Sequence, residues 1–291
     1  MTEINTAGSD RTLLRLLPGV LRARDFHLYL EGGQRLTDLW LQGGRAILGH
    51  KPAKVLGELK NAAERGLFGS FPHPQEARFI KALGQFFPGR AFRLYQDMSS
   101  LYLALEKAGF KELAAAPLSD PAFPQHTPRQ IIGVQGAEKP LISLWRPFIE
   151  IEADISRLTT FWIPVLPWPL GPVVLVLDKN MEPLFPQGEL ISPVLLAPAT
   201  RAMYDLAAKT CPPDFRRYPK LEKALKGGFW KRRGIYITME PSTNMEEYAV
   251  LFRRFLDGGF LIPPSPVEPV ILPAEMSQGE ESKLAALFKL Q

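Results

Sequence analysis

Cysteine and histidine are scarce in this chain of 291 residues. Cys211 is the single cysteine, so no internal disulfide can form. No two of the four histidines stand at the close spacing of a metal-ligand pair. The sequence therefore predicts no metal site.

Long apolar runs are also missing. No stretch of about 18 uncharged apolar residues occurs, and the first ten residues are polar rather than basic and then apolar. We expect neither a membrane span nor a secretory signal, and the default compartment is the cytoplasm.

A strong excess of one charge is absent as well, because 35 basic residues face 30 acidic ones. The densest basic stretch, 220–233, contains Phe229 and Trp230, and such a mixture can bind nucleic acid by stacking bases on its aromatic rings. A solvated helix face followed by an exposed turn is the interpretation that we favour. Nucleic acid is therefore not the expected partner.

The apolar residues that are present, 46% of the chain, suffice for one or two domains. Leucines at helical spacing predict a helix over 11–24 that Pro18 interrupts. The paired glycines at 32–33 separate the apolar runs 27–30 and 35–39, which predicts a hairpin.

Short apolar runs between proline and glycine breaks predict strands in the middle of the chain, at 131–134, 141–144, 148–151 and 173–177. A helix is expected over 192–209. The final part alternates a strand at 234–239, a helix at 244–256 with Asn244 as N-cap, a strand at 267–272 and a helix at 279–290.

Both ends of the chain resemble a known family. The stretches FHLYLEGGQRLTDLW, GGRAILGHKPAKVLGELKNAAERG and FGSFPHPQEARFIKAL between Phe26 and Leu83 are similar, in order and spacing, to the start of class III aminotransferases. They are most similar to glutamate-1-semialdehyde aminomutases. The stretch LFRRFLDGGFLIPPSPVEPVILPAEMSQGEESKLAALF resembles the C-terminal unit of the same family.

This resemblance implies an α/β fold of the fold-type-I, pyridoxal-phosphate-dependent class. In the family the small domain is built from both chain ends, so we expect it to comprise 1–90 and 234–291. A shortened large domain would then comprise 91–233. The family also implies a homodimer with active sites at the subunit interface.

The resemblance further implies a lysine that carries pyridoxal phosphate and an aspartate on the pyridinium nitrogen. Lys179 ends an apolar strand, and Asp154 precedes it by 25 residues, so one register assigns these two roles to them. The other register makes Asp178 the pyridinium partner, and no suitable lysine then follows.

The family binds the cofactor phosphate at a hydroxyl- and glycine-rich corner, and the matching place here reads Asp97-Met98-Ser99-Ser100. Ser99 and Ser100 can donate to a phosphate. Asp97 instead brings a negative charge, and Met98 brings a Cβ where the family has glycine.

Two function classes follow. The first is an aminotransferase-like protein with a degraded cofactor site and no bound cofactor, which binds a protein or small-molecule partner or regulates one. The second is a pyridoxal-phosphate-dependent aminotransferase or aminomutase that acts on an amino or semialdehyde substrate through Lys179.

Overall fold

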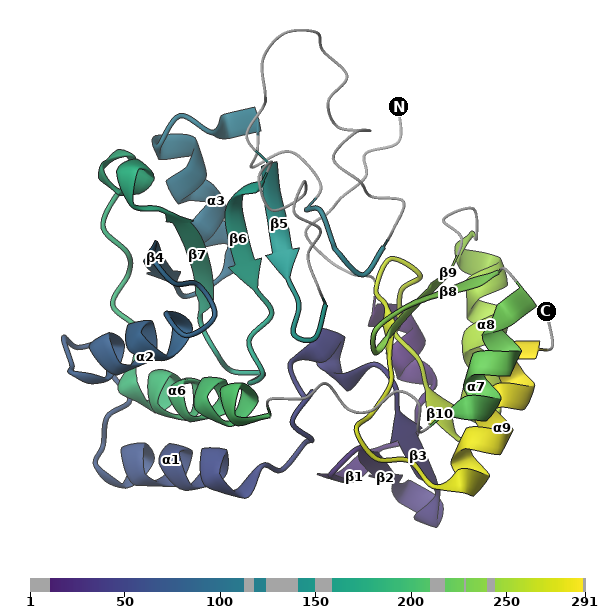
Figure 1. Cartoon of the computed structure of the whole chain (residues 1–291). Coiled ribbons are helices and arrows are strands. Elements are labelled where there is room, and N and C mark those ends of the chain that lie inside the picture. The colour runs from purple at the N-terminus through teal and green to yellow at the C-terminus, as the bar shows by residue number, and fades with distance from the viewer. Residues whose placement is uncertain are drawn as a thin grey trace, which may run out of the picture. The chain divides into compact units, whose positions relative to one another are not determined.

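A computed structural model describes residues 11–112, 118–123, 141–149, 159–209, 218–227, 229–239 and 244–289. The chain divides into two compact units (Figure 1). Unit 1 comprises Met1–Lys51 and Cys211–Gln291, and unit 2 comprises Pro52–Thr210. Each unit therefore has its own core and is described separately.

The first sheet of unit 1 contains the predicted hairpin. Its strand order is β1 (Val20–Arg24), β2 (His27–Leu30), β3 (Arg35–Asp38) and β10 (Phe260–Leu261). Strands β2 and β3 are antiparallel, and Gly32 and Gly33 between them adopt φ values of 80° and 84°. The hairpin prediction is confirmed, because only glycine adopts such angles without strain.

The second sheet of unit 1 has the order β11 (Val270–Ile271), β9 (Tyr236–Met239) and β8 (Trp230–Arg233). The helices of the unit are α7 (Pro219–Ala224), α8 (Met245–Asp257) and α9 (Gln278–Lys289). The N-cap prediction is confirmed, because the Asn244 side chain accepts a hydrogen bond from Glu247 N at 2.8 Å. Short 3-10 helices complete the unit: η1 (Arg11–Leu16), η2 (Glu31–Gly33), η3 (Leu41–Gly44) and η7 (Leu225–Gly227).

Glu280, in the first turn of α9, joins the two ends of the chain. Its Oε1 atom lies 2.9 Å from His27 Nε2 and accepts a hydrogen bond from Thr37 Oγ1 at 3.1 Å. Its Oε2 atom accepts from Ser277 N at 2.9 Å, and Ser277 Oγ in turn accepts from Glu280 N. Glu280 therefore completes a capping box with Ser277 at the start of α9, and its contacts with His27 and Thr37 hold this helix against β2 and β3.

Unit 2 contains a four-stranded sheet with the order β4 (Arg90–Tyr95), β7 (Val173–Asp178), β6 (Thr159–Pro164) and β5 (Leu141–Trp145). Its helices are α1 (Ala53–Glu64), α2 (Gln75–Leu83), α3 (Met98–Lys107) and α6 (Pro193–Ala208), with the 3-10 helix η5 (Lys179–Leu184) after β7. The strand predicted at 173–177 and the helix predicted at 192–209 are confirmed as β7 and α6.

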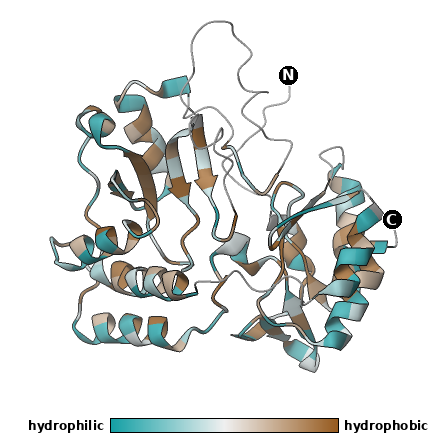
Figure 2. Cartoon of the chain, viewed as in Figure 1, coloured by the Kyte–Doolittle hydropathy of each residue, from teal (hydrophilic) through white to brown (hydrophobic). Residues whose placement is uncertain are grey.

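The core of unit 2 lies between the sheet and α3. Leu101 and Leu105 of α3 are buried with Leu175 of β7 and Phe161 of β6 in one apolar cluster. On the other side, α6 packs against α1 and α2 (Figure 1). Strand β7 is hydrophobic along its length (Figure 2), as expected for a strand between two neighbours in a sheet that is covered on both faces.

Two local predictions differ from the structure. The helix expected over 11–24 is a 3-10 helix up to Leu16 and then strand β1, which pairs with β2. Pro18 ends the helical segment, and pairing with β2 outweighs the leucine periodicity. The strand expected at 148–151 is absent at its described residues, since β5 ends at Trp145 and Phe148 has a φ of 61°. The strand expected at 131–134 lies outside the described residues.

The unit boundaries also differ from the expected domain boundaries. Residues 52–90, expected with the small domain, belong to unit 2, because α1 and α2 pack on α6. Residues 211–233 belong to unit 1, where Lys220 N donates to Glu281 of α9 at 2.8 Å.

The Glu280 junction predicts a defined pH dependence of stability. Burial alone would raise the pKa of Glu280, but hydrogen bonds from Ser277, His27 and Thr37 outweigh it and lower this pKa to about 2. A depressed carboxyl pKa stabilises the fold above the unfolded pKa of 4.5, and this stabilisation is lost as the pH falls toward 2. Glu280→Gln should therefore reduce the free energy of unfolding by roughly 1–2 kcal/mol at pH 7 and by much less near pH 2.

Urea unfolding at several pH values measures this difference, with the exposed Glu275→Gln as control. A Glu280→Gln effect that is the same at pH 7 and pH 2.5 would contradict this account.

Candidate functional site

The strand directions of unit 2 divide its sheet into two different edges. Strand β7 is antiparallel to both β4 and β6, whereas β5 and β6 are parallel. Strands β4, β5 and β6 therefore share one direction, and their carboxyl ends lie at one edge. In α/β sheets this carboxyl edge is where ligands usually bind. The carboxyl end of β7 lies at the opposite, amino edge.

At the carboxyl edge, β4 leads into the predicted phosphate corner. Ser99 and Ser100 lie in the first turn of α3, as the sequence predicts. Asp97 is the N-cap of α3, and its Oδ1 atom accepts a hydrogen bond from Ser100 N at 2.8 Å. A carboxylate of the chain thus already occupies the donor end of the helix, where a phosphate would otherwise bind.

The segment after β5 carries a buried ion pair. Arg146 donates from Nε and Nη2 to the two carboxylate oxygens of Asp120, at 2.7 and 2.6 Å. Their side chains are 5% and 11% exposed. Asp120 also accepts from Ala122 N, and Ser143 of β5 donates to Ser119 O at 3.1 Å. Segment 119–123 is therefore fixed beside β5 by internal contacts.

Two buried polar atoms near this edge have no hydrogen-bond partner within the described part of the chain. They are the hydroxyl of Tyr95, at the end of β4, and the indole nitrogen of Trp168, in the segment after β6. Burial raises the pKa of Tyr95 to about 12, although the Arg93 charge lowers it, so this phenol stays protonated at neutral pH.

Asp178 and Lys179 lie at the amino edge. Asp178 is opposite Arg90 in the ladder and forms an ion pair with it. Lys179 begins η5, is exposed, and has no ion-pair or hydrogen-bond partner for its side chain among the described residues. Five residue steps of β4 separate Arg90 from Tyr95, so Lys179 and Ser99 are roughly 17 Å or more apart.

The structure thus does not bring the predicted site residues together. Ser99 and Ser100 lie at the carboxyl edge, and Asp178 and Lys179 lie at the amino edge. Asp154 lies outside the described residues, so the predicted pair of Asp154 and Lys179 has no described geometry.

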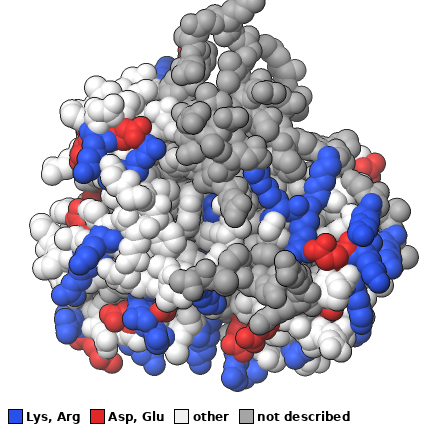
Figure 3. Space-filling view, in the orientation of Figure 1, with Lys and Arg blue, Asp and Glu red and all other residues white. Residues whose placement is uncertain are grey.

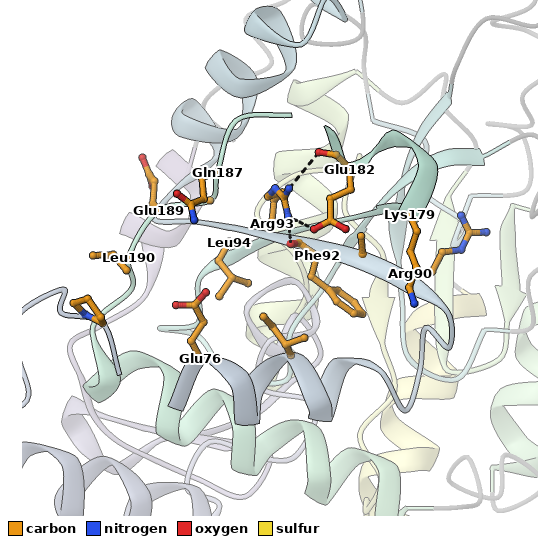
Figure 4. Close-up of a pocket in the computed structure, with 14 residues that line it drawn as sticks. Glu76, Arg90, Phe92, Arg93, Leu94, Lys179, Glu182, Gln187, Glu189 and Leu190 are labelled. Carbon is orange, nitrogen blue, oxygen red and sulfur yellow. Dashed lines mark hydrogen bonds and ion pairs between the residues drawn. The ribbon is translucent and has the colours of Figure 1, made fainter. Parts of the chain in front are cut away.

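A cavity of about 700 Å³ lies along β4, the edge strand of the sheet. Its wall includes the amino-edge Lys179, and Figure 4 shows this side chain together with Arg90, Arg93 and Glu182. Arg93 Nη1 donates to Glu182 Oε1 at 2.7 Å, and Arg93 Nε donates to Pro186 O at 3.2 Å. Sequence reasoning missed this cavity, because its walls come from four separate segments.

The basic stretch 220–233 begins with helix α7, as expected, but the exposed turn expected after it is wrong, because Trp230–Arg233 form strand β8 paired with β9. Trp230 is 4% exposed and its ring contacts Phe255 and Phe288 in the core of unit 1. Arg232 pairs with Glu222. Basic side chains alternate with acidic ones over the face in Figure 3, so no single-sign surface is visible there.

Metal-binding groups and membrane-spanning helices are both missing from the described residues. Among the described residues, no group of three or more His, Cys, Asp or Glu side chains is arranged to hold a metal ion. No helix in the described ranges is long and apolar enough to cross a membrane.

Comparison with known proteins agrees with this architecture. No family model matches the chain. An uncharacterized protein of Treponema pallidum is 25% identical, over 90% of this chain and 91% of that protein. Plasmodium falciparum ornithine delta-aminotransferase superposes with a TM-score of 0.65 at 11% identity, over 94% of this chain and 92% of that chain. The glutamate-1-semialdehyde aminomutase of Pseudomonas aeruginosa PAO1 superposes with a TM-score of 0.65 at 13% identity, over 94% and 86%.

The chain has the class III aminotransferase fold. The expectation of a fold-type-I, α/β architecture is thereby confirmed. At 11% and 13% identity, the similarity to these two proteins is one of fold.

The buried pair of Arg146 and Asp120 predicts a large stability effect at the carboxyl edge. Asp120→Asn removes the carboxylate charge that pairs with the buried Arg146 side chain, and should lower the free energy of unfolding by about 3 kcal/mol. Asp205→Asn removes the helical pair of Arg201 and Asp205, and should cost about 0.5 kcal/mol or less.

Chemical denaturation of the two variants measures both values. Equal losses of unfolding free energy in the two variants would show that the ion pair of Asp120 and Arg146 is not buried as described.

Proposed function

We propose that this protein uses the aminotransferase fold without Schiff-base chemistry, and that it acts by binding a partner or a small molecule. The observation that carries the proposal is the direction of β7. This strand runs antiparallel to β4, so Lys179 and the helix start at Asp97–Ser100 lie at opposite edges of the sheet. A single pyridoxal phosphate molecule is too short to bond to Lys179 and place its phosphate at that helix start.

The residues of the carboxyl edge support the same conclusion, because they do not fit this cofactor. An internal aldimine needs a lysine amine. Among the described residues that follow β4, β5 and β6 at this edge, in the segments 96–100, 146–149 and 165–168, none is a lysine. Asp97 adds a negative charge at the start of α3, the helix that directly follows β4, and this charge disfavours a phosphate.

The competing function is a pyridoxal-phosphate-dependent aminotransferase or aminomutase that uses Lys179. The register that uses Lys179 gives the cofactor nitrogen to Asp154, which lies outside the described residues. In the other register the partner is Asp178, which is already paired with Arg90 and has no suitable lysine after it. No geometric observation favours this second function.

A labelling experiment distinguishes the two functions. The purified protein is mixed with pyridoxal phosphate, its absorbance is recorded, and it is reduced with borohydride and mapped by peptide mass. We expect no aldimine band at roughly 420 nm and no stoichiometric pyridoxyl label on any lysine, since exposed lysines form only weak, unselective aldimines. A class III aminotransferase treated in the same way is the positive control.

One result contradicts the proposal. It is a stoichiometric label on Lys179 or another single lysine, together with the band, which is lost when that lysine is changed to alanine.

We further propose that the protein is a cytoplasmic homodimer. The resemblance to class III aminotransferases suggests this state, and two phenylalanines support an apolar contact surface. Phe68 and Phe71, between α1 and α2, are 64% and 63% exposed.

Sedimentation velocity should give twice the chain mass of 32.6 kDa, and the double variant Phe68→Ser, Phe71→Ser should shift the protein toward the monomer. The exposed Leu103→Ser is the matched control. A wild-type protein that sediments as a monomer at high concentration would contradict the dimer.

A further inference from the structure

The cavity along β4 has the size of a ligand site and an open backbone edge. Its volume of about 700 Å³ lies within the range of known small-molecule pockets. Strand β4 is the last strand of its sheet, so one side of its backbone is not paired with another strand of the described residues. Unpaired strand edges are templates for an additional extended chain.

The hydrogen bonds of β4 show which backbone groups face the cavity. Leu94 O accepts from Glu189 N at 2.8 Å, on the side away from β7. Alternate residues of a strand point the same way, so the N–H of Phe92 and the C=O of Arg90 also point outward. Neither group has a backbone partner among the described residues.

The segment that carries Glu189 covers only the Leu94 end of this edge. A Cβ built at Gly188 would lie 2.9 Å from Leu94 N and 3.0 Å from Leu94 O, so glycine permits this close approach. Beyond it, from Phe92 to Arg90, the edge borders the cavity.

Two charged side chains without partners stand toward the two ends of the open edge (Figure 4). Lys179 follows Asp178, which is opposite Arg90, so its ammonium lies toward the Arg90 end. The Glu76 carboxylate extends from α2 below Leu94, toward the other end. Neither side chain has an ion-pair partner among the described residues. In contrast, the arginines of the wall are already paired, Arg90 with Asp178 and Arg93 with Glu182.

We propose that this cavity binds a short extended peptide with free termini, which adds to the open edge of β4. Its carboxylate pairs with Lys179 and its ammonium with Glu76. These charges make the peptide run from the Leu94 end toward Arg90, antiparallel to β4, which is the more stable direction of pairing. Ile80, Phe92 and Leu190 in the cavity wall favour an apolar side chain in the middle of the peptide.

The length of the open edge sets the length of the ligand. Four residue steps from Leu94 to Arg90 span roughly 13 Å. An extended peptide of about three residues fills this distance once the Lys179 and Glu76 side chains reach toward its ends.

This proposal rests on the binding role proposed above and names its ligand class. The test is isothermal titration calorimetry of the full chain with the tripeptide Ala-Leu-Ala. Its C-amidated form, its N-acetylated form and a form methylated on the leucine nitrogen are titrated beside it. The free tripeptide should bind, and each capped or methylated form should bind about tenfold more weakly, since one ion pair or hydrogen bond is lost.

Matched variants locate the contacts. Lys179→Ala should weaken the free tripeptide about tenfold and leave the C-amidated form unchanged. Glu76→Gln should weaken the free tripeptide about tenfold and leave the N-acetylated form unchanged. Lys81→Ala removes an exposed charge of α2 that does not line the cavity, and should change nothing.

Several results would overturn the peptide site: no binding of the free tripeptide at millimolar concentration, equal binding of the free and capped forms, or affinities that neither variant changes. Cofactor labelling and peptide binding are separate measurements. Missing peptide binding without a pyridoxyl label overturns the peptide site alone, whereas a specific label overturns the proposed function.

Discussion

The direction of one strand determines the chemistry available to unit 2. Strand β7 runs antiparallel between β4 and β6, so its carboxyl end points to the edge at which β4 begins. Charged residues that follow β7 therefore cannot join those that follow β4, β5 and β6. The ladder of paired residues between β4 and β7, from Arg90 to Tyr95, fixes this relation.

The two edges that result have different character. The carboxyl edge is closed by groups of the chain itself, because Asp97 caps α3 and Arg146 is neutralised by Asp120. The amino edge carries the exposed Lys179, and a cavity extends from there along β4 toward Glu76 near Leu94. Neither charged side chain has an ion-pair partner in the described part of the chain. In our account, the fold of the aminotransferases has been kept while the ligand-binding edge has changed.

Much of the fold could be predicted from the sequence, because local signals determine it. Gly32 and Gly33 specify a hairpin turn, Asn244 caps a helix, and the apolar run 173–177 becomes a buried strand. Local periodicity misled at 11–24, where Pro18 ends the helical segment and pairing of 20–24 with the adjacent strand β2 decides the structure. Unit 1 contains residues from both ends of the chain, and Glu280 supplies a contact that holds them together.

The candidate site was less predictable, because spacing along the chain contains no information on strand direction. Asp178 and Lys179 follow an apolar strand at a spacing like that of a cofactor site, but only the pairing of β7 with β4 reveals their edge. Ser99 and Ser100 lie where the sequence suggested, at the start of α3. The sequence did not reveal that the Asp97 side chain accepts a hydrogen bond from the backbone N–H of Ser100.

The separation of the two edges is the central claim, and a distance between spin labels tests it most directly. Cys211 is the only cysteine, so Cys211→Ser gives a background for the double variant Ser99→Cys, Lys179→Cys. Electron paramagnetic resonance should find a distance distribution centred at roughly 17 Å or beyond, as the length of β4 requires. A distribution below about 10 Å, within the length of one cofactor molecule, would contradict the account and return Lys179 to the phosphate corner.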